Sequence, residues 1–260
     1  MAGLLQGMVV VVAGHGDGLG ASLARRSAAQ GARLVLARRN AKRLERAADE
    51  LRADGAEVLT HHIDLEDEDA HAGLVKATLA EFGRADVLFN NAFRMPPMDP
   101  LTQVDQAAIL SSVATNVLAP VTLSAAFADA LAQTEGNIVM VNSAVLYQSQ
   151  PEFAAYKLTK GALQHATESL ASELGPRGIR VNTLVPSYIY EDLNKAWFDH
   201  LAAEQGVTRQ DIYDEKAAAT DLRRLATADD VADAGILLAS PLARAVTGVC
   251  LQASCGEFHR

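Results

Sequence analysis

The chain has 260 residues, of which 49% are hydrophobic and 21% are charged. This composition excludes a disordered chain, because disordered chains typically combine low hydrophobicity with high charge. A net charge of −9 argues against a nucleic-acid partner, because proteins that bind a phosphate backbone usually carry a basic surface. We therefore expect one ordered globular domain over residues 1–260.

The N-terminal region contains a short apolar run at 8–13. This run is too short for a signal peptide or a membrane span, so we interpret it as a buried strand and expect a cytoplasmic protein with no membrane partner. The two cysteines, Cys250 and Cys255, have no CxxC spacing and no cluster of histidines beside them. We predict that both are reduced thiols and that the chain has no metal site.

Short β-branched runs alternate with amphipathic stretches along the chain, a pattern typical of a parallel sheet with helices on both faces. The strands are predicted at 8–13, 33–37, 57–62, 86–89, 137–142, 178–184 and 247–252. The helices are predicted at 19–30, 41–53, 67–81, 104–133 (continuous or broken), 152–174 and 228–239. The pattern indicates a single-domain α/β fold with a doubly wound sheet of about seven parallel strands.

The segment 187–226 differs in character from the rest of the chain. It follows a predicted strand, and it combines many charges with five aromatic residues, Tyr188, Tyr190, Trp197, Phe198 and Tyr213. We interpret it as a helical insertion within the domain that covers a site and binds substrate.

A glycine-rich turn joins the first predicted strand to the first predicted helix. Gly14 permits a tight turn, Gly18 permits backbone N–H groups to approach phosphates, and Gly20 permits close packing of the helix. A plain loop is the alternative, but the strand–turn–helix order favours a dinucleotide pyrophosphate site. No Gly-Lys-Ser/Thr follows, which excludes a Walker-type loop. His15 is expected to be a solvated loop histidine.

The end of the second predicted strand carries Arg38 and Arg39 and no carboxylate. A carboxylate at this place accepts from the ribose 2′-OH of NAD, whereas an arginine accommodates the 2′-phosphate of NADP. Asp17 in the glycine turn opposes that phosphate, and a solvated arginine pair is the alternative. We therefore favour NADP(H) as the cofactor and keep NAD(H) as the other choice.

A candidate catalytic set lies in the second half of the chain. Ser143 follows the buried strand at 137–142, and Tyr156 and Lys160 share one face of the next helix as i and i+4. A neighbouring ammonium favours the phenolate, so Lys160 would lower the Tyr156 pKa. Ser143 could then hold a substrate oxygen while Tyr156 gives it or takes from it a proton. An exposed Tyr/Lys pair is the alternative.

Taken in order, these motifs resemble the short-chain dehydrogenase/reductase family over essentially the whole chain. Its adenine-contacting Asp matches Asp64, its Asn-Asn-Ala segment matches 90–92, and its active-site Asn resembles Asn116. The resemblance implies a Rossmann-type fold and assigns Asn116, Ser143, Tyr156 and Lys160 to catalysis. It assigns cofactor contacts to Gly14, Gly18, Leu19, Gly20, Arg38, Arg39, Asp64, Leu65, Asn91, Ala92, Tyr156, Lys160 and Pro186.

The resemblance also implies two further roles. Lys160 would hold the nicotinamide ribose, and Asn116, through its helix backbone, would support a water that relays protons from the lysine. Each residue has a local alternative. Asn116 could bond within its own helix, and Asp64 could be a helix N-terminal charge beside other acidic residues.

The sequence departs from the family at three places. Phe93 and Ser187 replace glycines, and the threonine that usually contacts the nicotinamide amide is absent from 188–192. The loop after Phe93 is apolar and could line the substrate pocket. We predict that the substrate contacts include Phe93, Val145, Tyr188 and Trp197, with Met95, Met98 and Phe198 adding to a fairly apolar wall.

The predicted function is interconversion of a small-molecule ketone and a secondary alcohol. The alternatives are a 3-oxoacyl thioester reductase, a hydroxysteroid dehydrogenase and a non-catalytic nucleotide-sensing scaffold. Relatives in the family imply a homotetramer built on the helices at 104–133 and 152–174 and on the last strand. The residues expected to pack between subunits are Ala162, Leu163, Ala166, Leu170 and Ala171.

Overall fold

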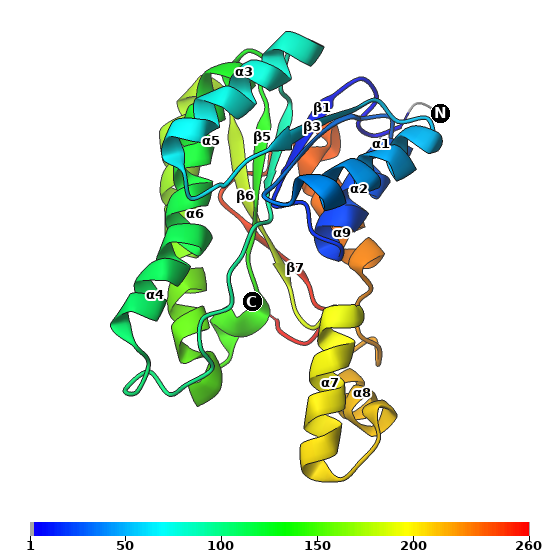
Figure 1. The fold of residues 1–260 in the computed structure, drawn as a ribbon, viewed down its shortest axis with the longest axis vertical. Helices are drawn as coiled ribbons and strands as arrows, with labels where there is room; N and C mark the ends of the chain where they lie inside the picture. The colour runs from blue at the N-terminus through cyan, green and yellow to red at the C-terminus, as the bar shows by residue number, and fades with distance from the viewer. Residues whose placement is uncertain (1–2, 260) are drawn as a thin grey trace.

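The computed structural model describes residues 3–259, in which seven parallel strands form one sheet. The order across the sheet is β3-β2-β1-β4-β5-β6-β7 (Figure 1). The strands are β1 Val9–Ala13, β2 Arg33–Arg38, β3 Val58–His62, β4 Val87–Asn90, β5 Asn137–Val141, β6 Arg180–Pro186 and β7 Cys250–Ala253. The chain reverses direction across the sheet between β1 and β4, where doubly wound folds bind ligands. The predicted fold class is confirmed.

Helices cover both faces of the sheet (Figure 1). One face carries α1 Leu19–Ala29, α2 Ala41–Ala53 and α9 Ala228–Ala239. The other carries α3 His71–Phe82, α5 Ala119–Ala132 and α6 Ala154–Leu174. The predicted bounds of α2 and α9 are those observed. Asn40 and Thr227 explain this agreement, because each caps its helix N-terminus with a side-chain oxygen.

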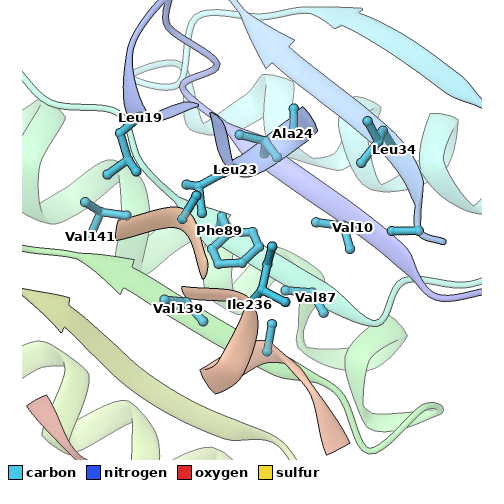
Figure 2. Packing of buried hydrophobic residues seen from close by; sticks show 14 of the residues in the cluster. Val10, Leu19, Leu23, Ala24, Leu34, Val87, Phe89, Val139, Val141 and Ile236 are labelled. Atoms are coloured by element: carbon cyan, nitrogen blue, oxygen red, sulfur yellow. The ribbon is translucent and has the colours of Figure 1, made fainter. Parts of the chain in front are cut away.

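Two hydrophobic cores result from the alternation of side chains along each strand. In β1, Val10 and Val12 point to the core under α1 and α9, whereas Val9 and Val11 point to the core under α5 and α6. Figure 2 shows the first of these cores, with Phe89 of β4 at its centre. Because β1, β2, β4 and β5 are buried on both sides, they are apolar apart from residues at their ends, and this property made them visible in the sequence.

The long helical segment at 106–132 is broken in the middle. It consists of α4 Gln106–Val113, a π-helical turn Ala114–Leu118, and α5. By length and composition alone this segment could cross a membrane. However, α5 packs Leu123, Phe127 and Leu131 into the second core, so the fold itself accounts for its apolar character.

Two strands begin two or three residues later than the sequence predicted. β6 begins at Arg180 rather than 178, and β7 begins at Cys250 rather than 247. Gly178 and Gly248 precede them with φ of +78° and +74°. This left-handed conformation is incompatible with an extended strand, so each strand can start only after its glycine.

The segment 187–226 contains α7 Asp192–Gln205 and α8 Arg209–Ala218. These helices project from one end of the molecule (Figure 1). They have a small core of their own, in which Phe198 and Ile212 are buried and Tyr188, Tyr190 and Trp197 are partly buried. The aromatic residues that distinguish this segment in the sequence therefore serve first to hold the two helices together.

Candidate active site

A cleft of about 1230 Å³ runs along the carboxyl ends of the strands. Its wall includes every predicted site residue except Asn116 and Phe198; Phe198 was expected in the substrate wall but is fully buried in the core between α7 and α8. It is larger than the roughly 300–1000 Å³ that is usual for a drug-sized ligand, and it extends from the glycine turn to Tyr156 and the start of α7. A dinucleotide and a small substrate therefore fit in it together.

The glycine turn is shaped by contact with the loop after β4. Gly14 has a φ of +82°, and a Cβ added to it would lie 2.6 Å from Cβ of Ala92 and would overlap the Ala92 backbone. Asn91 closes the contact, since its Nδ2 donates to the Gly14 carbonyl at 2.8 Å. Gly20 also faces Asn91, and a Cβ there would lie 2.9 Å from its Nδ2. The turn thus presents backbone rather than side chains to the cleft, as a phosphate cradle requires.

His15 is not the solvated loop residue that was expected. Only 2% of it is exposed, and its Nδ1 is buried without a hydrogen-bond partner among the described residues. Burial, assisted by the charge of Arg38, lowers the pKa of His15 to about 4. The prediction was wrong because the turn folds inward, where backbone bonds from Gly14 and His15 to Ala37 hold it against β2. His15 is therefore a neutral wall of the cleft.

Three ion pairs occupy the region predicted for the adenosine ribose. Arg38 donates to Asp17 at 3.0 Å, and Arg43 donates to the other Asp17 oxygen at 3.1 Å. Arg39 lies 3.8 Å from Asp64. The side chain of Arg38 is only 15% exposed, so it is not a solvated arginine. A 2′-phosphate at this place would meet Arg38 already paired with Asp17.

Ser143, Tyr156 and Lys160 converge at the other end of the cleft. Ser143 follows β5 and caps a short 3₁₀ turn by accepting from the Val145 N–H at 3.2 Å. The Lys160 ammonium donates to the Val141 carbonyl at 2.9 Å and lies 5.8 Å from the centre of the Tyr156 ring. The end of β5 therefore positions Ser143 and, through the Val141 carbonyl, the Lys160 ammonium. Helix α6 places Tyr156 and Lys160 together beside the cleft.

The protonation states of this set are governed by burial. Burial raises the pKa of Tyr156 to about 12, although its hydrogen bond with Ser143 acts in the opposite direction. Burial also lowers the pKa of Lys160 to about 7. The sequence led us to expect a lowered Tyr156 pKa, but in this structure the pKa is raised, and burial of the phenol is the largest cause. The Tyr156 phenol is therefore protonated at neutral pH.

Asn116 lies behind the cleft, in the π-helical turn, and is 1% exposed. Its Oδ1 accepts from the Arg94 N–H at 2.7 Å, and its Nδ2 donates to the Arg94 carbonyl at 2.9 Å and to Thr159 Oγ1 at 3.1 Å. The Asn116 side chain therefore bonds the Arg94 backbone and Thr159, and not its own helix as in the local alternative. Asn116 ties the loop after Phe93 to α6, one turn from Tyr156.

Replacing Asn116 by Leu should destabilise the protein, because the Arg94 N–H and carbonyl would lose their partners. Each buried polar group left unpaired costs about 1–3 kcal/mol, so we expect the free energy of unfolding to fall by about 2–4 kcal/mol in urea titrations. Thr122→Val is the control, since Thr122 bonds only carbonyls of its own helical segment. Equal effects of the two substitutions would contradict this role for Asn116.

The substrate end of the cleft carries the predicted aromatic residues. Phe93 is 46% exposed, and its ring lies 6.5 Å from that of Tyr156. Val145, Tyr188 and Trp197 line the same end. Phe93 replaces a glycine, and its half-exposed side chain forms part of the cleft wall.

Glu257 near the C-terminus is a residue that the sequence did not indicate. Its Oε1 accepts from Gln148 at 3.0 Å, and its Oε2 accepts from the hydroxyl of Ser187. Ser187, the second replaced glycine, thus fastens the C-terminal segment to the start of the insertion. Only the long-range contact shows this, since Glu257 lies 70 residues from Ser187 in the chain.

Comparison with known protein families gives one match over most of the chain. The family described as enoyl-(acyl carrier protein) reductase matches residues 13–257. A relative from Erythroxylum coca, tropinone reductase-like 3, is 30% identical over 255 residues, covering 98% of this chain and 95% of the relative. The matched range 13–257 spans the glycine turn, Ser143, Tyr156 and Lys160.

Solved structures of similar proteins share the whole fold. NAD⁺-bound xylitol dehydrogenase superposes with a TM-score of 0.88 at 26% identity, covering 97% of this chain and 99% of that one. A 7α-hydroxysteroid dehydrogenase in complex with NADH and 7-oxo glycochenodeoxycholic acid has a TM-score of 0.86 at 27% identity, with 97% and 94% covered. Both are similar to this chain from β1 to β7.

Proposed function

Because the chain belongs to the short-chain dehydrogenase/reductase family, we propose that it interconverts a ketone and a secondary alcohol, with Tyr156 as general acid and base. As a member of that family it is an NAD(P)-dependent oxidoreductase. The proposal that Tyr156 acts on a ketone or alcohol rests on one observation. Ser143, Tyr156 and Lys160 converge at one end of the cleft, and the glycine turn lies at the other end.

The chemistry of the proposal divides between the cofactor and the chain. A bound nicotinamide supplies or accepts the hydride. In reduction, Ser143 donates a hydrogen bond to the substrate oxygen, and Tyr156 gives that oxygen its proton. Lys160, whose pKa lies near 7, is charged in part of the molecules at neutral pH and can return a proton to the phenol. The reverse direction uses the same groups in the opposite order.

The wall of the substrate end favours a fairly apolar compound. Phe93, Val145, Tyr188 and Trp197 all line this part of the cleft and present mostly hydrocarbon. A small ketone or alcohol with an apolar body is the first candidate. A 3-oxoacyl thioester and a steroid are the alternatives, and the steroid is supported by the bound 7-oxo compound of the similar hydroxysteroid dehydrogenase.

A panel of ketones, 3-oxoacyl thioesters and oxo-steroids, assayed with NADPH and with NADH, tests the proposal. We expect consumption of the reduced cofactor with at least one class. Binding of a dinucleotide without turnover on any class would favour the alternative, a non-catalytic nucleotide-sensing scaffold. Absence of both would reject the proposal.

We also propose a cytoplasmic homotetramer, with one change to the expected contacts. Leu163, Leu170 and Ala171 are buried in the core beneath α6, so they cannot pack against another subunit. Ala162 and Ala166 stay accessible on α6. The exposed Leu158 on α6, and Leu110 and Leu118 on the preceding helical segment, add apolar surface for such a contact. Light scattering should give about four times the chain mass of 27.6 kDa, and a monomeric particle would contradict the proposal.

A further inference from the structure

We propose that the carboxylate of Glu191 occupies the diphosphate cradle when no cofactor is bound, and that this resident anion sets the affinity for the cofactor. The inference rests on the proposed function, since it takes the glycine turn as the place of the diphosphate. Glu191 belongs to the insertion, 173 positions after Gly18 in the chain.

The contact between Glu191 and Gly18 is direct. A Cβ added to Gly18 would lie 2.5 Å from Oε1 and 2.6 Å from Cδ of Glu191. Gly18 is the residue before α1, and no side chain caps this helix. The first N–H groups of a helix have no partner within it and attract anions. The carboxylate thus lies over the backbone that a diphosphate would use.

Backbone bonds bring Glu191 to this place. The Tyr190 N–H donates to the Ala226 carbonyl, and Lys195 N–H donates to the Glu191 carbonyl at the start of α7, both at 2.8 Å. Asn194 Nδ2 donates to the Ile189 carbonyl at 2.8 Å. The segment is therefore held by its backbone, and these bonds do not involve the carboxylate of Glu191.

Few interactions retain the carboxylate in the cradle. Its Oε2 is buried and has no hydrogen-bond partner within residues 3–259. The nearest lysine in the helix, Lys195, pairs with Asp192 at 3.3 Å instead. Burial, and next the charge of Asp192, raise the pKa of Glu191. A carboxylate held this loosely can be displaced by a diphosphate, but at a loss of cofactor affinity.

Glu191→Gln keeps the shape of the side chain and removes its charge. The contact of this side chain with the backbone at Gly18 then weakens, and its repulsion of the diphosphate disappears. Both changes favour binding of the cofactor. At an effective dielectric near 20, a charge interaction over a few ångströms corresponds to a tenfold effect or more. We therefore expect the Kd of NADPH, NADH and ADP-ribose, measured by calorimetry, to fall about tenfold. Adenosine, which has no diphosphate, should bind as before.

Glu204→Gln is the matched control. It makes the same change on the same helix, α7, from an exposed side chain that pairs with His200 and does not line the cleft, and we expect it to change each Kd less than twofold. Equal Kd values for the parent and Glu191→Gln would overturn the inference. Weaker binding by the variant would overturn it too, because Glu191 would then contact the bound cofactor favourably. Tighter binding without turnover on any substrate would support the inference and reject the proposed function instead.

Discussion

Tyr156→Phe should lower kcat by about 10²–10⁴-fold, the usual contribution of a general acid or base. The substitution removes one oxygen and keeps the ring beside Phe93 and Lys160. Cofactor affinity and folding should therefore change little. Steady-state kinetics with the best substrate of the panel, combined with calorimetric titration of the cofactor, separate the loss of chemistry from a loss of binding.

Tyr213→Phe is the control for this prediction. Tyr213 lies on α8 and stacks against Tyr190 at 4.6 Å between ring centres, away from Ser143. The Tyr213→Phe enzyme should keep the parent kcat within about twofold, because the substitution is remote from the reacting groups. A Tyr156→Phe enzyme with most of the parent activity would show that another group moves the proton.

Arg38→Ala should lower kcat/KM with NADPH about 10- to 150-fold and affect NADH much less. The range corresponds to the roughly 1.5–3 kcal/mol of a hydrogen bond to a charged group. Only NADPH carries a 2′-phosphate for the guanidinium to bind. The structure adds that Arg38 is already paired with Asp17, so binding the phosphate requires Arg38 to share or leave that carboxylate.

Asp17→Asn should consequently increase the preference for NADPH. It releases Arg38 and removes a negative charge that would repel the 2′-phosphate. The Asp17 side chain is 60% exposed, so water and salt screen this repulsion in part but do not abolish it. Arg46→Ala is the control for both variants, since Arg46 lies on the outer side of α2 and pairs with Glu50. The assignment of Arg38 to the phosphate is wrong if the parent prefers NADH, or if Arg38→Ala reduces kcat/KM equally with both cofactors.

The sequence predicted those parts of the site that depend on local order. Gly14, Gly18 and Gly20 lie between a buried strand and a helix, and a spacing of four residues places Tyr156 and Lys160 on one helix face. Such relations need only the geometry of single elements and of a parallel sheet. For the same reason the bounds of α2 and α9, which begin at local caps, were predicted correctly, whereas the starts of β6 and β7 were not.

By itself, then, the sequence determined the alternation of elements, the edge of the sheet at which the site lies, and which residue types, those of Ser143, Tyr156 and Lys160, meet there. Tertiary structure alone decided the burial of His15, the pairing of Arg38 with Asp17, the bonds of Asn116 to the Arg94 backbone, and the position of Glu191 over Gly18. These contacts join residues that local geometry does not bring together. Their partners are set by how helices and loops pack across the sheet, and the resulting desolvation, rather than residue type, sets the pKa of His15, Tyr156 and Lys160.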